Sequence, residues 1–426
     1  MTARSLTTPF LKDLEQRALL VDKTIDVEEP DFSSSPTLYV GFDPSASSLH
    51  AGSLVPLLGM DRFRRRGGQI IVLVGCATGL IGDPAGKDQE RVLQSFEEVE
   101  VKAQALRAQI AAFFEHTDGP APVFVNNADW YRGMDVIHFL RDVGKHFSVN
   151  QMLAKESVRT RIEREGHGIS FTEFSYQILQ AYDFLHLFRT HGCTWQMGAS
   201  DQWGNIVSGV DLIRRCAAGK AHGLTLPLLT NSEGKKYGKS ESGAAWLDPA
   251  QTSPYAFFQF WRNTTDADVA RFLTWLTDLS AEEVAALMEA PAHLREPQVR
   301  LARLLTARVH GAQQAALAED ASEVIFSNRF ERITPGTVAM LSTAVPTCTA
   351  PDGVPFGLAD ALLGLEAVKS RGELRRLVQQ RGVKVNGVAA ESIDDDLRAR
   401  GEGRVAVVVS VGAARRFLVR LAPLPG

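Results

Sequence analysis

The sequence predicts an α/β protein in which a parallel sheet carries helices on both faces, followed by a helical domain and a small α+β domain. Over the first half of the chain, short β-branched runs alternate with helical segments, which indicates β-α-β units. From Pro254 to about Arg332 the pattern becomes helical, with Phe and Trp crowded at positions 257–261. Near the end, a basic amphipathic helix precedes a glycine turn and a strand.

Five runs are expected to form the strands: Thr37–Phe42, Gln69–Gly75, Val123–Asn126, Thr194–Gly198 and Leu224–Leu229. The clearest helices between them are Leu54–Arg65, Gln89–Glu115, Phe171–Arg189 and Gln202–Ala217. Ligands of an open parallel sheet bind just beyond the carboxyl ends of the strands. The loops that follow the strands are therefore where the chemistry is expected.

Changes in composition, and the residues that interrupt helical periodicity, suggest four segments. Residues 1–250 form the sheet domain and residues 251–333 the helical domain. The stretch 334–354 is rich in Thr, Pro, Ser and Gly and is interpreted as a linker, which leaves 355–426 as the last domain.

Bulk properties exclude several classes of protein. The chain has 426 residues, 45% of them hydrophobic, which is enough for two or three domains with cores. It contains no apolar run of the roughly 18 to 20 residues that a membrane helix needs, so a soluble cytoplasmic protein is expected. Its four cysteines form no C-x-x-C pair, so no zinc site is predicted. The net charge is −4, yet residues 351–426 carry 12 Lys and Arg against 9 Asp and Glu, which makes this tail a candidate nucleic-acid module.

The first strand is followed by Tyr39-Val-Gly-Phe-Asp-Pro-Ser-Ala-Ser-Ser-Leu-His50-Ala-Gly-Ser53 and then by a long helix. This places His50 at a helix amino terminus, where backbone N–H groups favour phosphate, and Gly52 allows a ring or sugar to approach closely. A His near a helix start is more often structural than functional. The stretch nevertheless resembles the "HIGH" motif of class I aminoacyl-tRNA synthetases, with Ser53 in place of the last His.

The loop from Gly75 to Arg91 is glycine-rich but is not a phosphate-binding Walker A loop, because Asp88 stands where a Ser or Thr must hold magnesium. It resembles the mobile loop of the bacterial tyrosyl-tRNA synthetases. That resemblance implies that Asp83 holds the substrate's amino group and that Lys87 and Arg91 meet the pyrophosphate. The alternative is a solvated basic pair on a surface loop.

In the helix Phe171-Thr-Glu-Phe-Ser-Tyr176-Gln-Ile-Leu-Gln180-Ala-Tyr-Asp183, the residues Tyr176, Gln180 and Asp183 fall on one face. Polar groups in such apolar surroundings need partners, which a polar ligand would provide, although an exposed polar stripe is the alternative. The helix closely resembles the tyrosine-binding helix of the same family. The runs Gly198-Ala-Ser-Asp201-Gln202-Trp-Gly-Asn205 and Lys236-Tyr-Gly-Lys239-Ser240 resemble its "GSDQWGN" motif and its "KMSKS" loop.

The resemblance spans nearly the whole chain, and it implies a Rossmann-type catalytic domain and a tyrosine-tRNA ligase activity. The enzyme would activate L-tyrosine with ATP to tyrosyl-adenylate and pyrophosphate, then transfer tyrosine to its tRNA. The implied catalytic residues are Ser45, His50, Lys87, Arg91, Lys236, Lys239 and Ser240. The implied tyrosine-binding residues are Tyr39, Asp83, Tyr176, Gln180, Asp183 and Gln202. The implied ATP-binding residues are Gly41, Asp43, His50, Gly52, Ser53, Asp201 and Lys239.

The C-terminal domain resembles the RNA-binding domain named after small-subunit ribosomal protein four, and the implied tRNA contacts are Arg375, Arg376, Arg381 and Lys384. A solvated helix face is the alternative for this basic helix. The resemblance also implies a homodimer and Mg²⁺ that arrives with ATP, with no protein-bound metal. Two rival functions stay open: a tryptophanyl-tRNA synthetase, and a catalytically inactive RNA-binding or regulatory protein of the same fold.

Overall fold

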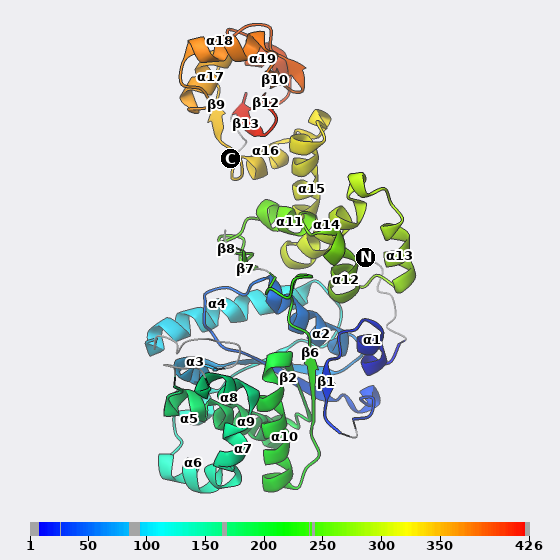
Figure 1. The fold of residues 1–426 in the computed structure, drawn as a ribbon, viewed down its shortest axis with the longest axis vertical. Helices are drawn as coiled ribbons and strands as arrows, with labels where there is room; N and C mark the ends of the chain where they lie inside the picture. The colour runs from blue at the N-terminus through cyan, green and yellow to red at the C-terminus, as the bar shows by residue number, and fades with distance from the viewer. Residues whose placement is uncertain are drawn as a thin grey trace. The chain divides into compact units, whose positions relative to one another are not determined.

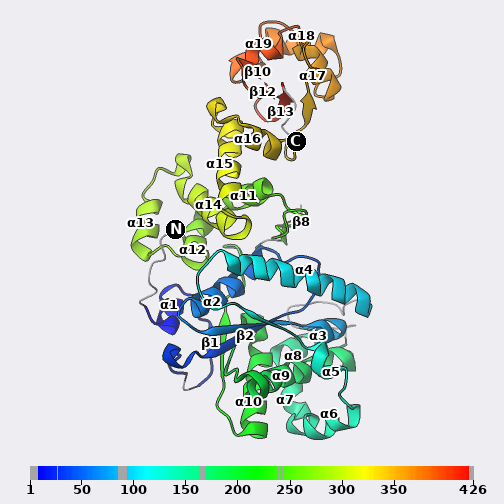
Figure 2. The ribbon, with the colours of Figure 1, turned by 180° about the vertical axis from the view of Figure 1, so that it is seen from behind.

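The computed structural model describes residues 8–25, 27–84, 94–163, 168–237, 239–240 and 243–421. The chain forms two compact units. The first comprises Met1–Asp248 with Arg271–Ser280, and the second comprises Pro249–Ala270 with Ala281–Gly426. Figures 1 and 2 show the chain from opposite sides. The finer domain limits at residues 250, 333 and 354 remain predictions.

The first unit is built on a six-stranded sheet with the order β1-β6-β5-β2-β3-β4. Five of these strands are parallel, as predicted: β2 (Thr37–Phe42), β3 (Gln69–Val74), β4 (Val123–Asn126), β5 (Trp195–Ala199) and β6 (His222–Leu226). The short β1 (Asp22–Lys23), which the sequence analysis missed, pairs antiparallel with β6 at the edge. β2 lies between β3 and β5, so the strand order reverses there, which is where open sheets of this kind bind ligands.

Helices cover both faces of this sheet, as predicted. Helices α2 (Leu54–Arg64) and α4 (Phe96–Glu115) lie on one face, and α9 (Phe171–His191) and α10 (Trp203–Ala217) lie on the other (Figures 1 and 2). The sheet is buried between them, and β3 is a continuous apolar run in which five of six residues are buried. The shorter helices are α1 (Phe10–Gln16), α3 (Cys76–Ile81), α5 (Ala128–Tyr131), α6 (Val136–Asp142), α7 (Val149–Leu153) and α8 (Glu156–Ile162).

Local signals fix where the long helices begin and end. Ser95 caps α4 in a reciprocal capping box with Glu98, and Ser170 accepts from the backbone N–H of Glu173 at the start of α9. α9 ends at Gly192, which adopts a left-handed conformation that glycine tolerates without strain. Helix α9 therefore holds its polar residues in a fixed register against the sheet.

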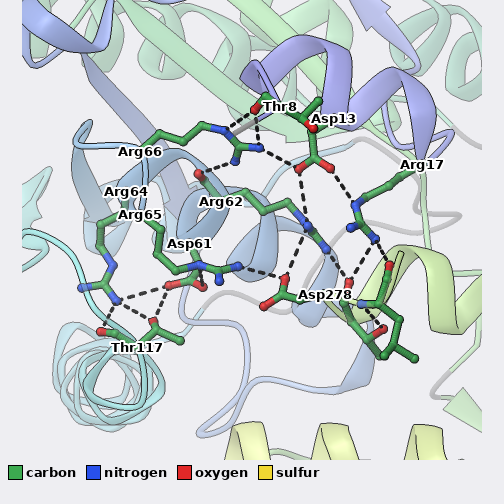
Figure 3. Close-up of polar contacts among 12 residues, drawn as sticks. Thr8, Asp13, Arg17, Asp61, Arg62, Arg64, Arg65, Arg66, Thr117 and Asp278 are labelled. Carbon is green, nitrogen blue, oxygen red and sulfur yellow. Dashed lines mark hydrogen bonds and ion pairs between the residues drawn. The ribbon is translucent and has the colours of Figure 1, made fainter. Parts of the chain in front are cut away.

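A cluster of arginines and aspartates holds the carboxyl end of α2 in place (Figure 3). Asp61 accepts from the Thr117 hydroxyl at 2.6 Å and pairs with Arg64 at 3.2 Å and Arg65 at 2.9 Å. Asp13 of α1 pairs with Arg66 at 3.0 Å, with Arg62 of α2 and with Arg17, which directly follows α1. The exposed Asp278 pairs with Arg65. We call this group the α2 ion cluster. It joins α1, α2, the end of α4 and the segment 271–280, which all belong to the first unit.

The helical part of the second unit packs around aromatic residues of α11 (Pro254–Arg262), where Phe257, Phe258 and Trp261 are almost fully buried. Its other helices are α13 (Ala281–Met288), α14 (Glu296–His310), α15 (Ala312–Phe326) and α16 (Pro335–Leu341). Helix α12 (Asp266–Leu276) has residues in both units. Single 3-10 turns occur at η1 (Phe32–Ser34), η3 (Gly144–His146), η5 (Ala292–Leu294) and η6 (Phe330–Arg332).

The stretch 334–354, expected as a linker, contains regular structure. It forms α16, in which Val338 and Leu341 are buried, and strand β9 (Thr347–Thr349). β9 pairs in parallel with β13, the last strand of the C-terminal sheet. Thr334 and Pro335 start a helix here because a capping hydroxyl followed by proline at the first helical position favours one.

The C-terminal part of the second unit is a five-stranded sheet with three helices, as the predicted α+β domain requires. The strand order is β11-β10-β12-β13-β9, with β10 (Val383–Val385), β11 (Val388–Ala389), β12 (Ala406–Val411) and β13 (Arg415–Arg420). Asn386 and Gly387 both have positive φ, the conformation that a two-residue hairpin turn requires. Helices α17 (Leu358–Gly364), α18 (Arg371–Gln379) and α19 (Leu397–Gly401) complete this part.

Candidate active site

A cleft of about 550 Å³ opens in the first unit where β2 and β5 end. The residues that line it come from the ends of these two strands, the loop before α2, and helices α3 and α9. The cleft lies beyond the carboxyl ends of the strands, where the sequence analysis placed the ligands, and the structure locates it at the reversal of strand order. Of the expected site residues, it brings together Tyr39, Gly41, Asp43, Ser45, His50, Gly52, Ser53, Asp83, Tyr176, Gln180, Asp183, Asp201, Gln202 and Lys236.

The loop after β2 brings His50 to the rim through a local turn. His50 precedes the 3-10 turn η2 (Ala51–Ser53), and its Nδ1 accepts from the backbone N–H of Gly52 at 3.0 Å. A Cβ at position 52 would lie 2.8 Å from the His50 ring, so glycine is required for this contact. His50 also forms a β-bridge with Trp246, whose ring stands edge-on at 6.4 Å. Nδ1 is thereby fixed as an acceptor, and the other ring nitrogen carries the proton when the imidazole is neutral.

Two buried groups, Tyr39 and Asp183, meet at one end of the cleft. The Tyr39 side chain is 1% exposed, and its hydroxyl has no hydrogen-bond partner among the residues that the structure describes. Burial, followed by the charge of Asp183, raises the pKa of Tyr39 well above its usual value, so the hydroxyl is protonated. A buried hydroxyl without a partner is costly, and a bound polar group would satisfy it. The Gln180 Oε1 atom is also buried and has no partner within the described part of the chain.

Asp183 is held by two donors that the sequence analysis missed. Trp130 donates its indole N–H to Oδ1 at 3.0 Å, and the Asn127 amide donates to Oδ2 at 3.1 Å. Burial raises the pKa of Asp183 to about 7, although these hydrogen bonds oppose the shift. Asn127 directly follows β4, and a polar residue at the carboxyl end of a strand is the signal that could have revealed it.

Asp83 and Gln202, which also line the cleft, contact each other. The Gln202 amide donates to Asp83 at 2.6 Å and its oxygen accepts from Asn205 at 3.2 Å. Asp201 belongs to the 3-10 turn η4 (Ser200–Gln202) after β5. Burial raises the pKa of Asp201, and the positive charge of Lys236 opposes that shift.

The remaining expected catalytic residues lie in loops. Lys87 and Arg91 fall outside the described residues. Lys239 and Ser240 form strand β7, which pairs with β8 (Gly243–Ala244), but their side chains lie outside the described part of the structure. Of the catalytic residues expected in this loop, Lys236 is therefore the one that is described as lining the cleft.

The four expected tRNA contacts lie in the second unit and are exposed. Arg375 and Arg376 are on α18, whose opposite face buries Leu374 and Val378. Arg381 follows this helix and Lys384 is on β10. The four basic residues are thus exposed on a packed helix-turn-strand unit.

No described helix is long and apolar enough to cross a membrane. Nor do the described residues contain a group of three or more His, Cys, Asp or Glu side chains arranged to hold a metal ion.

A model of the family "tRNA synthetases class I (W and Y)" matches residues 33–327, well over half of the chain, so the fold is that of a class I tRNA synthetase. The tyrosine–tRNA ligase of Roseiflexus castenholzii is 44% identical over 97% of this chain and 100% of that protein. That of Anaeromyxobacter dehalogenans is 46% identical over 92% and 94%. A truncated mitochondrial tyrosyl-tRNA synthetase of Aspergillus nidulans superposes with a TM-score of 0.65, at 29% identity over 75% of this chain and 94% of that one. The chain belongs to the tyrosine–tRNA ligase family.

Proposed function

We propose that the chain activates L-tyrosine with ATP and transfers the tyrosyl group to the 3′ end of a tyrosine-specific tRNA. The observation that carries this proposal is the buried pair at the end of the cleft. Tyr39 offers a protonated hydroxyl that no described residue pairs with, and Asp183 offers a carboxylate whose position is fixed by Asn127 and Trp130. A phenol can donate to Asp183 and accept from Tyr39 at once. A phenylalanine ring would leave both groups unpaired.

The first step needs no general base, because the tyrosine carboxylate is already a nucleophile. One carboxylate oxygen bonds to the α-phosphorus of ATP while the bond from that phosphorus to the bridging oxygen breaks, and pyrophosphate leaves with the electron pair. Catalysis then consists of positioning and of stabilising the charge that grows on the leaving group. We assign the positioning of the amino acid to Asp83, Tyr176, Gln180 and Gln202.

We assign the stabilisation of the negative charge on the leaving pyrophosphate to Lys236, together with His50 and Ser45 on the loop after β2. Lys87, Arg91, Lys239 and Ser240 are proposed to join them when ATP is bound. Gly41, Asp43, Gly52, Ser53 and Asp201 are assigned to the nucleoside and phosphates. Mg²⁺ is proposed to enter with ATP, because this ion is usually held by substrate phosphates and water rather than by an all-protein cage.

ATP–pyrophosphate exchange with each of the twenty amino acids tests the first step. The expected result is exchange with tyrosine and none with phenylalanine. Exchange with tryptophan instead would support the tryptophanyl alternative. No exchange with any amino acid by a folded protein would support the inactive RNA-binding alternative.

The second step requires tRNA, and we assign its binding to the exposed residues Arg375, Arg376, Arg381 and Lys384. Contacts of Lys and Arg with phosphates give affinity that falls with salt. The expected measurement is tRNA affinity that declines steeply with ionic strength. Tyrosine affinity, measured alongside as the control, should change little.

We also propose that the protein works as a homodimer in the cytoplasm. Large apolar side chains are exposed on α6 to α9, which lie near one another in both views (Figures 1 and 2). They are Val136, Ile137, Leu140, Val149, Leu153, Ile162 and Phe171. Exposed large apolar side chains on neighbouring helices are typical of an interface.

Light scattering tests the dimer. The wild type is expected to have about twice the chain mass of 46.6 kDa, and Ile137→Glu is expected to shift it toward one chain mass. Val101→Glu on α4 is the matched control, because Val101 and Ile137 are both 66% exposed. Equal effects of the two substitutions would count against this interface.

A further inference from the structure

A continuous chain of hydrogen bonds joins two carboxylates that line the cleft, those of Asp183 and Asp43. The Asn127 amide donates to Asp183 at 3.1 Å and to the Thr78 hydroxyl at 2.9 Å. The Thr78 hydroxyl donates to Asp43 at 2.7 Å. The four residues come from α9, the start of α5, α3 and the loop after β2. Asn127 and Thr78 are 0% and 2% exposed, so water does not compete for these bonds.

The direction of every bond in this chain follows from the chemistry of its members. The backbone N–H of Ala77 can only donate, and it donates to Asn127 Oδ1 at 2.7 Å. The Asn127 amide nitrogen must therefore face Asp183 and Thr78, with one hydrogen for each. The Thr78 oxygen accepts one of them, so its own hydrogen is available for Asp43. A single arrangement of hydrogens therefore satisfies every donor and acceptor in this series of hydrogen bonds.

The Asp43 end is confined as closely as the Asp183 end. The Tyr176 hydroxyl donates to the second oxygen of Asp43 at 2.8 Å. At the end of β3, a Cβ on Gly75 would lie 2.1 Å from Asp43 Oδ1 and 2.4 Å from the Thr78 hydroxyl. Glycine at position 75 is thus what allows Asp43 and Thr78 to meet.

From this geometry we propose that Asn127 and Thr78 are positioning residues that couple recognition of the tyrosine hydroxyl at Asp183 to binding of ATP beside Asp43. The inference rests on the proposed function, which assigns the phenol to Asp183 and the nucleotide to Asp43. Neither positioning residue has to touch the phenol or the phosphates.

The sign of the coupling follows from charge. The two carboxylates repel each other, and the charge of Asp43 contributes to the raised pKa of Asp183. A phenol that donates to Asp183 draws negative charge from it and lessens that repulsion, while Asn127 and Thr78 keep Asp43 oriented. ATP is a polyanion, so it binds more tightly to the less negative cleft. Tyrosine and ATP are thus expected to strengthen each other's binding by the same factor.

The test measures the dissociation constant of α,β-methylene-ATP, which is not cleaved, with and without saturating L-tyrosine. The wild type should bind the analogue several-fold more tightly with tyrosine. Thr78→Val has the same shape but lacks the hydroxyl, and it should reduce this enhancement to less than twofold. Thr78→Ser restores the hydroxyl and should restore the enhancement. Asn127→Ala breaks the same chain on the other side of Thr78 and should match Thr78→Val.

Trp130→Phe is the control, because it removes a donor to Asp183 but leaves the chain to Asp43 intact. It should weaken tyrosine binding about tenfold, the usual effect of one buried hydrogen bond, and keep the enhancement at saturating tyrosine. An enhancement that survives in both Thr78→Val and Asn127→Ala, or that Trp130→Phe abolishes equally, overturns the inference. So does a wild type without enhancement. A wild type without tyrosine-dependent pyrophosphate exchange would instead contradict the proposed function itself.

Discussion

Replacing Asp183 with Asn should impair tyrosine activation and, at the same time, make the first unit more stable at alkaline pH. Asn is the same size, but it offers one acceptor oxygen where two donors point, from Asn127 and Trp130. One donor must then face the new NH₂ group in the free protein. When tyrosine binds, the phenol competes with the remaining donor for that single oxygen, which leaves a buried donor unpaired at a cost of about 1–3 kcal/mol, and the phenol loses a charged acceptor worth about 1 kcal/mol. The specificity constant for tyrosine should fall about 30- to 700-fold, with little change in the KM for ATP.

The stability effect has the opposite sign because the pKa of Asp183 is raised by burial from its ordinary 3.8 to about 7. An acid with a raised folded-state pKa destabilises the fold progressively as pH rises from the unfolded to the folded pKa, and the cost is constant above it. Within this range wild type loses about 1.36 kcal/mol of stability for each pH unit, and about two such pH units lie between pH 5 and pH 7. The variant, which carries no charge at this position, should therefore gain about 3 kcal/mol relative to wild type between pH 5 and pH 8.

Hydrogen exchange of the α9 amides at the two pH values measures this gain locally, so it does not require the two units to unfold together. The cost of the donor that faces the new NH₂ group is the same at both pH values, so it cancels when the stabilities at the two pH values are compared. In wild type, the same titration should weaken tyrosine binding as pH falls below about 7, since the phenol needs the ionised carboxylate. Activation of tyrosine within fivefold of wild type, or a stability difference that does not vary with pH, would refute this reasoning.

Three further predictions concern other parts of the chain. Asp61→Asn should lower the stability of α2, measured by hydrogen exchange, by about 3–5 kcal/mol, because it leaves buried Arg64 without its counter-charge. Asp278→Asn, at a side chain that is 52% exposed, should lower it by under about 1 kcal/mol. Equal losses in the two variants would contradict the importance of burial. Lys236→Ala should lower the adenylation rate constant about tenfold or more without weakening tyrosine binding, whereas its neighbour Lys235, exposed and paired with Glu233, is the control whose loss should have little effect. Ending the chain after Pro346 removes the whole C-terminal sheet, including β9. This truncation should leave pyrophosphate exchange near normal while tRNA charging falls to a small fraction of the wild-type rate. Full charging by the truncated protein would exclude the tail as the tRNA-binding part.

The sequence by itself determined the sheet and most of the cleft. The five parallel strands are recognisable because strands buried on both faces are continuous apolar runs, and β3 is such a run. Parallel strands also present their carboxyl ends at one edge of the sheet, so residues placed after different strands, such as Asp43 and Asp201, could be expected in one site before any distance was known. Helix periodicity likewise placed Tyr176, Gln180 and Asp183 on one face of α9.

Only the tertiary structure showed how these groups are held. Asn127 and Trp130 lie in no motif, and Thr78 lies in the Gly75–Arg91 stretch without a predicted role. These residues reach Asp183 and Asp43 across 35 to 56 positions of sequence. The strand β9 was hidden for the same reason, since its partner β13 is far along the chain and its own composition is that of a loop. Local patterns encode which face of a helix or strand is apolar. Which buried donor meets which carboxylate depends on the packing of separate elements, and no periodicity in the sequence records it.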